Sequence, residues 1–502
     1  MPALRNLSYF QKSVAVIIFF TVLRIILSFF LELGNDESYY WTYADRLQWN
    51  YFDHPPLVGV WIKFFTLNLL LDDHVFFIRL GSFISCALSS FFIYKTIATI
   101  SSERAGLIGV FLYNISFYAT ISAGTIMTPD VPQMVFWTLS MYMIAKIFED
   151  VNRWKYWLLF GLSAGLCIMS KVHGVFLWGG LFLYAIFYMR ELFFKKQVYV
   201  AALMTIIVIS PILIWNIQND FITYRFHSDR VIVDKETTLH WLGLLREMIG
   251  QVLVNNPFLI ALVFIFLFSK KALASSVSNR VFKFIALPLL GIIFLIALFR
   301  QSLPHWSGPV YVTLLPMAAI GLAQLSLRTA TNTVRWAFTY TGIFLLLLIY
   351  AVNFYPGTFG QKTEPYLGKG DISLDAYGWR EAGGKFGILY KNNAGTGKPP
   401  LVCNDLWGAH EEYYFARPLN VPMIGLGTVN ALHHYAWRNK YTIPKTNMDT
   451  AFCIVHSDEY YDPRKAYAGY YSTIDSITTI NILRGNKPAH NFYVYRLSGW
   501  QK

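Results

Sequence analysis

Long apolar stretches separated by short polar gaps are the feature that most constrains this chain of 502 residues. A helix needs about 20 mainly apolar residues to cross a bilayer. Eleven stretches meet this requirement approximately: Val14 to Leu33, Val75 to Ile100, Ala105 to Ser122, Val131 to Phe148, Trp154 to Met169, Val172 to Met189, Val198 to Trp215, Pro257 to Phe268, Val281 to Phe299, Val310 to Leu327 and Trp336 to Phe354. Only 14% of the residues are charged, whereas a soluble chain has roughly 25%. The sequence therefore predicts a polytopic α-helical membrane protein with about 11 transmembrane helices.

The formal net charge of +13 would suggest a nucleic-acid partner in a soluble protein. Here the basic residues gather in alternate gaps between the apolar stretches: Arg5 and Lys12, Lys95 and Arg104, Arg153 and Lys155, Arg190, Lys195 and Lys196, Lys270, Lys271 and Arg280, and Arg328 and Arg335. The positive-inside rule assigns such gaps to the cytoplasm. The first stretch lacks a signal-peptide cleavage site, so we expect a retained helix. We therefore expect a cytoplasmic amino terminus, a carboxyl terminus on the other side, and no nucleic-acid partner.

The pattern changes after Phe354. Residues 1–354 are expected to form the transmembrane domain, with a first outer loop over residues 34–74. Residues 355–502 combine strand-like runs, such as Leu401 to Cys403 and Ala451 to His456, with a helical pattern over Trp379 to Tyr390. This mixture predicts a small α/β extracytoplasmic domain. Two strand cysteines, Cys403 and Cys453, leave open both a disulfide and two buried thiols.

Ionisable residues cluster in the predicted outer loops. The first loop contains Asp36 and Glu37, followed by Asp53 and His54, and the second contains Asp130. The later outer loops add Lys171 and His173, Arg225 and His227, and His305. Charged groups near the bilayer are costly and tend to mark function. Together these residues offer carboxylates for acid–base chemistry and cations for holding a phosphate.

Each of these residues also has a structural explanation. Asp53 and Asp130 precede prolines at predicted helix starts, where a carboxylate can cap a helix. Lys171 can extend its charge to the membrane interface, and either histidine, His227 or His305, can be a satisfied polar group at a helix end.

Other polar and aromatic residues in this region are assigned no chemistry. Arg24 and Glu32 fall within the first predicted span, where we expect them to face the interior of the helix bundle. The aromatic residues after the acid pair are expected to anchor the loop at the membrane interface, with stacking on a sugar ring as the alternative: Tyr39, Tyr40, Trp41, Tyr43, Trp49, Tyr51 and Phe52.

Several motifs resemble a known family. The run DESYYWTYADRLQWNYFDHPPL, followed by TPDVP, WNIQNDF, HWSGP and DAYGWREA, is similar to the bacterial branch of the protein O-mannosyltransferase superfamily. That branch includes the lipid A aminoarabinose transferase and has the GT-C fold. The resemblance covers nearly the whole membrane part, and the acid pair with DHPP is its most specific element.

The resemblance implies an inverting glycosyltransferase in the bacterial inner (plasma) membrane. Such an enzyme moves a hexose or pentose from a polyprenyl phosphate, such as undecaprenyl phosphate, to a protein, a lipid A-like glycolipid or a surface glycan. Asp36 matches the acid associated with catalysis, and Glu37, Asp53 and Asp130 match the other acids of the site. His54 stands where the aminoarabinose transferase has a lysine, which leaves the sugar and the phosphate contact open.

The chemistry is consistent with this expectation. A carboxylate must take the proton of the acceptor hydroxyl, and fixed cations must stabilise the leaving phosphate. His54, Lys171, Arg225 and His305 are the candidates for binding the donor phosphate. No cofactor is certain; a divalent metal ion is an alternative phosphate clamp, with Asp53, His227 and His305 as its candidate ligands.

Two other functions are also compatible with many charged residues on the outer face. A transporter or flippase for a lipid-linked sugar is the main alternative, but its ionisable residues should lie near the bilayer midplane. A membrane sensor with a ligand-binding outer domain would leave the acid-rich first loop unexplained.

Overall fold

The computed structural model of the chain describes residues 7–231, 239–267, 277–395 and 397–502. It divides into two compact units. We call Met1–Ile26 with Leu47–Phe344 the membrane unit, and Leu27–Arg46 with Leu345–Lys502 the C-terminal unit. The C-terminal unit therefore includes the start of the first outer loop. Arg5, Lys270 and Lys271, which contribute to the expected orientation, lie outside the described residues.

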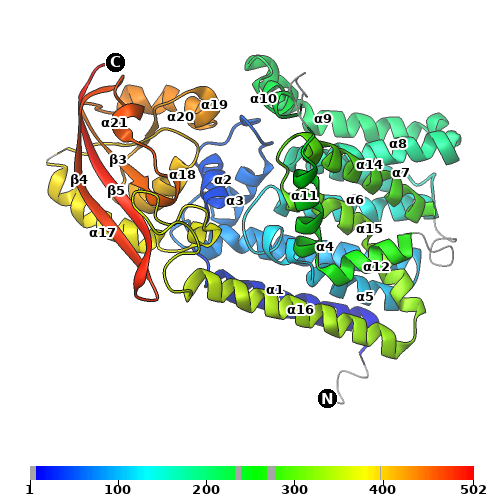
Figure 1. Ribbon diagram of the computed structural model, residues 1–502. Helices are drawn as coiled ribbons and strands as arrows, with labels where there is room; N and C mark the ends of the chain where they lie inside the picture. The colour runs from blue at the N-terminus through cyan, green and yellow to red at the C-terminus, as the bar shows by residue number, and fades with distance from the viewer. Residues whose placement is uncertain (1–6, 232–238, 268–276, 396) are drawn as a thin grey trace. The chain divides into compact units, whose positions relative to one another are not determined.

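The membrane unit is helical throughout its described part (Figure 1). Its helices are α1 (Tyr9–Ser28), α3 (Leu57–Phe65), α4 (Val75–Ile100), α5 (Glu103–Asn114), α6 (Asp130–Glu149), α7 (Trp154–Ser170), α8 (Val175–Tyr188), α9 (Lys196–Gln218), α10 (Ile222–Val231), α11 (Trp241–Asn255), α12 (Pro257–Leu267), α14 (Val277–Phe299), α15 (Gly308–Gln324) and α16 (Leu327–Asn353). Short helical turns join them: η2 (Tyr118–Ser122), η3 (Val172–Gly174), η4 (Arg190–Phe194) and η5 (Pro304–Ser307).

Seven of the described helical segments are long and apolar enough to cross a membrane: α1, α4, α6, α9, α14, the segment Pro304–Gln324 and α16. The pair α11 and α12, bent by 104°, would be an eighth span. The fold is therefore a polytopic helical membrane protein. Four of the eleven predicted stretches correspond to helices shorter than this length: α5, α7, α8 and α12. For example, α5 ends at Asn114, and a separate π-helical turn follows at Tyr118–Ser122.

The packing of neighbouring helices brings the start of α6 close to the end of α7. Helix α6 packs against both α4 and α7, and α7 packs against α9. Helices α1 and α16 run side by side, with Phe20 and Phe338 in edge contact at 6.0 Å (Figure 1). Because α6 and α7 are consecutive and antiparallel, the start of α6 and the end of α7 lie at the same end of the unit. Arg24 faces the interior of this unit as expected, because its guanidinium donates to the Asn114 amide oxygen at 2.8 Å.

The C-terminal unit is an α/β fold around one five-stranded sheet with the order β2-β1-β3-β5-β4. The strands are β1 (Leu401–Cys403), β2 (Met423–Gly425), β3 (Thr450–His456), β4 (Tyr471–Arg484) and β5 (Lys487–Trp500). The first three pair in parallel, whereas β3, β5 and β4 pair antiparallel. The helices of the unit are α2 (Asn35–Asp45), α17 (Trp379–Asn393), α18 (Gly408–Glu411), α19 (Val429–Leu432), α20 (Tyr435–Thr442) and α21 (Pro463–Ala466). The expected small α/β domain and its strands at residues 401 and 451 are therefore present.

The two strand cysteines lie on opposite faces of the sheet. Strands β1 and β3 are neighbours in the register Val402↔Cys453. Successive residues of a strand point to opposite faces, so Cys403 points away from the face that Val402 and Cys453 share. Burial raises the pKa of the Cys453 thiol to about 12. Both cysteines are free and buried.

Two expectations about the first loop are wrong. Glu32 lies beyond the end of α1 and not within a span. Its carboxylate accepts hydrogen bonds from the Trp379 and Arg380 amides at 2.7 and 3.3 Å. The aromatic residues do not form an exposed anchoring belt: all except Trp49 are buried. Tyr39 and Tyr43 contact each other and the rings of His433 and His434. These contacts within the C-terminal unit replace contacts with lipid headgroups.

Candidate active site

A buried ion pair joins the start of α6 to the end of α7. The Lys171 ammonium lies 2.8 Å from the Asp130 carboxylate, and their side chains are 7% and 3% exposed. The Tyr118 hydroxyl donates to the other carboxylate oxygen at 2.9 Å. A buried carboxylate needs such partners, because an unpaired charge in a membrane interior is strongly unfavourable. The side chain of Asp130 makes no capping hydrogen bond, and Lys171 does not extend to the interface.

The local sequence explains how Tyr118 reaches this pair. Tyr118 begins the π-helical turn η2, a type of turn that is frequent at functional sites. Its ring lies against Gly308 of the HWSGP motif, where a Cβ atom would come within 2.2 Å of the ring. Only glycine leaves room for the tyrosine at this position. We had not selected Tyr118 from the sequence, since it lies in an otherwise apolar stretch.

Three imidazoles surround the ion pair. His305 and His173 interact electrostatically with both Lys171 and Asp130. His54 lies in the field of the same two charges and of Asp53, and burial lowers its pKa to about 4. It is therefore neutral at pH 7. The structure brings together His54, Asp130, Lys171 and His305, which are far apart in the sequence.

Polar atoms beside the pair lack partners in the described part of the chain. Gln133, one helical turn after Asp130, is fully buried, and neither end of its amide has a hydrogen-bond partner there. The same holds for Nδ1 of His173. Lys171 uses one of its three N–H donors on Asp130. Buried polar groups are nearly always paired, so this cluster has unused capacity for water or a polar ligand.

The YFDH segment packs against α10. A ring nitrogen of His227 lies 2.8 Å from the Asp53 backbone carbonyl, and the Thr223 hydroxyl donates to the Tyr51 carbonyl at 3.0 Å. Asp53 is not the residue that caps α3, because that helix begins at Leu57 after Pro56. Arg225 is exposed, and its guanidinium donates to the Asp220 carbonyl of its own segment.

The acid pair lies in the first turn of α2. Glu37 is buried and its carboxylate accepts the Gly34 amide at 3.3 Å, which closes a capping arrangement at the helix start. Asp36 is exposed. Of the two adjacent acids, Glu37 therefore has a structural task, and Asp36 is the one presented to solvent.

The three candidate metal ligands do not gather into one group that could hold an ion. Among the described residues, the group of side chains close enough to share an ion is His456, Asp458 and His490, not Asp53, His227 and His305. Both imidazoles lie 2.6 Å from the same Asp458 oxygen, whereas ligands around zinc are roughly 3 Å apart. These are hydrogen bonds, and the Asp458 carboxylate raises the pKa of His456 to about 9 against the opposing effect of burial. We therefore assign no catalytic role to a metal ion.

A polar stripe on α11 was also missed. Glu247, Gln251 and Asn255, four residues apart, are each 1% exposed. The Gln251 amide and the Ser302 hydroxyl donate to Glu247 at 2.8 and 2.6 Å. The spacing of these polar residues on one face of an apolar segment is a signal that could have revealed this helix.

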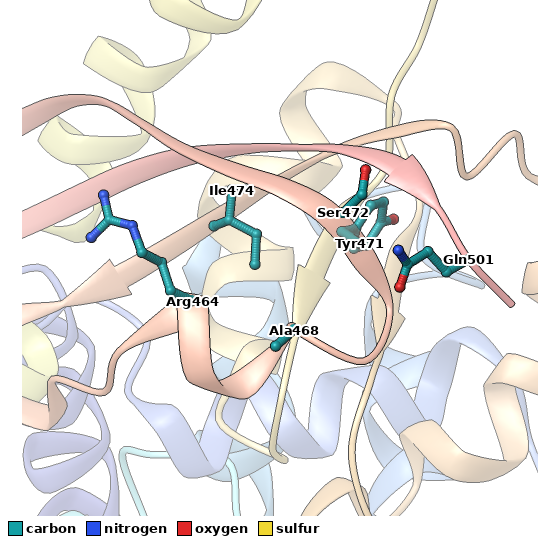
Figure 2. Close-up of a pocket in the computed structure, with 6 residues that line it drawn as sticks. All are labelled: Arg464, Ala468, Tyr471, Ser472, Ile474 and Gln501. Atoms are coloured by element: carbon teal, nitrogen blue, oxygen red, sulfur yellow. The ribbon is translucent and has the colours of Figure 1, made fainter.

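A pocket of about 350 Å³ in the C-terminal unit contains none of the predicted site residues. It lies where β4 begins, and Arg464, Ala468, Tyr471, Ser472, Ile474 and Gln501 line it (Figure 2).

Residues 53–215 match the family model of dolichyl-phosphate-mannose-protein mannosyltransferases. No curated protein sequence matches the chain. Among solved structures, the chain is similar to ArnT from Cupriavidus metallidurans bound to undecaprenyl phosphate, with a TM-score of 0.63 and 12% identity over 96% of this chain and 99% of ArnT. The apo form of ArnT gives a TM-score of 0.60 at 13% identity, with the same coverage.

A second similar structure is the oligosaccharyltransferase AglB from Archaeoglobus fulgidus, in complex with an inhibitory peptide and a dolichol-phosphate. Its TM-score is 0.53 at 12% identity, over 89% of this chain and 70% of AglB. The chain is therefore a polytopic membrane protein with the fold of ArnT and AglB, the GT-C fold, and its residues 53–215 resemble the mannosyltransferase family.

Proposed function

We propose that this protein is an inverting glycosyltransferase that moves a sugar from a polyprenyl-phosphate donor to a hydroxyl or phosphate of an envelope acceptor. The acceptor is a protein, a lipid A-like glycolipid or a surface glycan. The reaction takes place on the outer face of the bacterial inner membrane, where the charge bias of the short gaps assigns the first outer loop and the C-terminal region.

The polar cluster around Asp130 and Lys171 is the observation that carries this proposal. It combines a buried ion pair, three imidazoles and unpaired polar atoms. In a fold shared with ArnT, whose structure contains undecaprenyl phosphate, such a cluster is suited to a lipid phosphate. The peptide in the AglB complex supports a protein as one class of acceptor.

The proposed step forms one bond and breaks another. The acceptor oxygen attacks C1 of the sugar, the bond between C1 and the phosphate oxygen breaks, and polyprenyl phosphate leaves. For a hydroxyl acceptor, the exposed Asp36 carboxylate takes the proton. Proton transfer by a positioned group contributes roughly a hundredfold to ten-thousandfold to the rate. Glu37 caps the helix start that carries Asp36.

The leaving phosphate requires fixed donors. Lys171 offers its remaining N–H groups, His305 offers a ring N–H group, and the His54 imidazole lies in the field of the same ion pair. The Asp130 carboxylate holds the ammonium in place, and the Tyr118 hydroxyl in turn donates to that carboxylate. Arg225 stays a candidate for the donor phosphate, and Asp53 a candidate catalytic acid, on the sequence motifs alone.

A flippase for the same lipid-linked sugar is the alternative, and one assay separates the two functions. The purified protein in detergent micelles would be given polyprenyl-phosphate mannose, glucose or aminoarabinose singly, with envelope glycolipid or a serine- and threonine-rich peptide as acceptor. Phosphorus NMR distinguishes the donor phosphodiester from the released monoester. We expect acceptor-dependent conversion of one donor. A flippase would leave every phosphodiester intact, and that result for all donors with both acceptors would exclude the proposal.

A further inference from the structure

The amino end of α2 is held by a segment more than three hundred residues away in the sequence. A carboxylate oxygen of Asp375 accepts the Asn35 amide at 3.0 Å. The approach is close, because a Cβ atom at Gly34 would come within 2.5 Å of the other Asp375 oxygen. Asp375 thus binds the residue directly before Asp36. It belongs to the DAYGWREA motif, to which the chemistry above gives no role.

The contact is reciprocal. Glu32, just before α2, accepts the first two amides of α17, and the Glu32 amide donates to the Ala376 carbonyl at 3.2 Å. His410 adds a contact between its ring nitrogen and the Leu33 carbonyl at 2.7 Å. The α2 start and the α17 start therefore cap each other, and the position of one fixes the other.

A buried network fixes Asp375 in turn. Asp375 lies on the short turn η6 (Ile372–Ala376), in which the Ser373 amide and hydroxyl both donate to the Asp371 carboxylate. The fully buried Arg484 of β4 donates to Asp371 at 2.8 Å and to the Ser373 hydroxyl at 2.8 Å. Hydrogen bonds therefore connect Arg484 of the sheet to the turn η6, and Asp375 of this turn to the start of α2.

We propose that Asp375 is a positioning residue for Asp36: its carboxyl oxygen holds the amino end of α2 and so fixes the backbone from which the Asp36 side chain extends. This inference rests on the proposed function.

The Asp375 cap does not depend on the charge of the carboxyl group. Burial and the carboxylates of Asp36, Glu37 and Asp458 raise the pKa of Asp375 to about 7, against the Asn35 hydrogen bond. The protonated and the ionised carboxyl group both keep an oxygen that accepts the Asn35 amide, so the contact is retained on either side of this pKa.

The test compares Asp375→Asn with wild type, using the donor and acceptor that the micelle assay identifies. Asparagine keeps an oxygen for the Asn35 amide but removes the charge. We expect near-normal kcat and donor KM, because the capping oxygen is retained. Asp375→Ala, which also loses the capping oxygen, should lower kcat about tenfold or more with little change in the donor KM.

The control is Asp475→Asn, which removes an exposed charge on β4. It should leave both kcat and the donor KM unchanged. If Asp375→Ala turns over at the wild-type rate, or if Asp375→Asn is as slow as Asp375→Ala, the inference fails. If wild-type protein converts no donor, the proposed function fails first, which is a separate result. If the alanine variant does not fold, Asp375→Ser takes its place, because its shorter side chain withdraws the oxygen from the Asn35 amide.

Discussion

At the scale of single residues, Asp130 and Lys171 show what a sequence can and cannot reveal. Their residue types and loop positions suggested a site, but each alone was equally compatible with a helix cap or an interfacial lysine. Their contact joins residues 41 positions apart, which only the packing of α6 on α7 establishes. The same is true of Asp375 and Asn35, whose capping contact depends on a long-range fold that no local pattern encodes.

Lys171→Met should weaken the binding of polyprenyl phosphate by about tenfold or more, because a hydrogen bond to a charged group contributes about 1.5 to 3 kcal/mol. It should also lower stability, since removing one partner of a buried ion pair costs about 3 to 5 kcal/mol. Fluorescence titration with polyprenyl phosphate and thermal unfolding in detergent measure the two effects.

Asp130→Asn is the matched variant. It removes the other charge of the pair, but it leaves the ammonium free to meet the phosphate, so polyprenyl phosphate should bind at least as tightly as to wild type. The double variant should be less destabilised than the sum of the single variants. Equal binding by Lys171→Met and wild type would exclude Lys171 from the phosphate site.

At the scale of elements, hydropathy located helices reliably. All eleven predicted stretches overlap helices, and β1 has the predicted bounds. Among the helices that were missed, α2 and α11 were missed for opposite reasons. Helix α2 is too polar and aromatic to read as a span, whereas α11 buries its polar stripe and exposes its apolar side chains, such as Leu242 at 81%. Glu32 was placed in a span because hydropathy does not mark where α1 ends.

The strand register decides the state of the cysteines. Since Cys403 and Cys453 point to opposite faces of neighbouring strands, they cannot form a disulfide without rearranging the sheet. We expect the intact mass of the protein under non-reducing conditions to match four free thiols, and denatured protein to react with four equivalents of a thiol reagent.

Native protein should react far less, because all four thiols are buried. The variant Cys403→Ser provides the reference for one missing thiol. A mass lower by two hydrogens, with a peptide linking residues 403 and 453, would contradict the register.

At the scale of the whole molecule, each compact unit contains predicted site residues of its own. The membrane unit contains the cluster around Lys171, and the C-terminal unit contains Asp36. Sequence motifs predicted both sets of residues. They did not predict that residues 27–46 fold with the C-terminal region, because that association depends on the mutual capping of α2 and α17.

The central claim is that the protein transfers a sugar to an envelope acceptor with Asp36 as the base. Mass spectrometry of surface glycans and glycoproteins tests it in cells that carry the wild-type gene, no gene, or Asp36→Asn. Asparagine is nearly isosteric and retains an acceptor oxygen, so a purely structural residue should tolerate it at a cost of about 1 kcal/mol at most. A base should not, since losing proton transfer lowers turnover roughly a hundredfold to ten-thousandfold.

We predict that one sugar modification is absent both without the gene and with Asp36→Asn, and that the lipid-linked donor accumulates in both. Membrane levels of the variant protein, measured by immunoblotting, should equal those of wild type. Identical glycans in all three strains would contradict the claim of sugar transfer. A normal glycan profile with Asp36→Asn alone would contradict the assignment of Asp36 as the base.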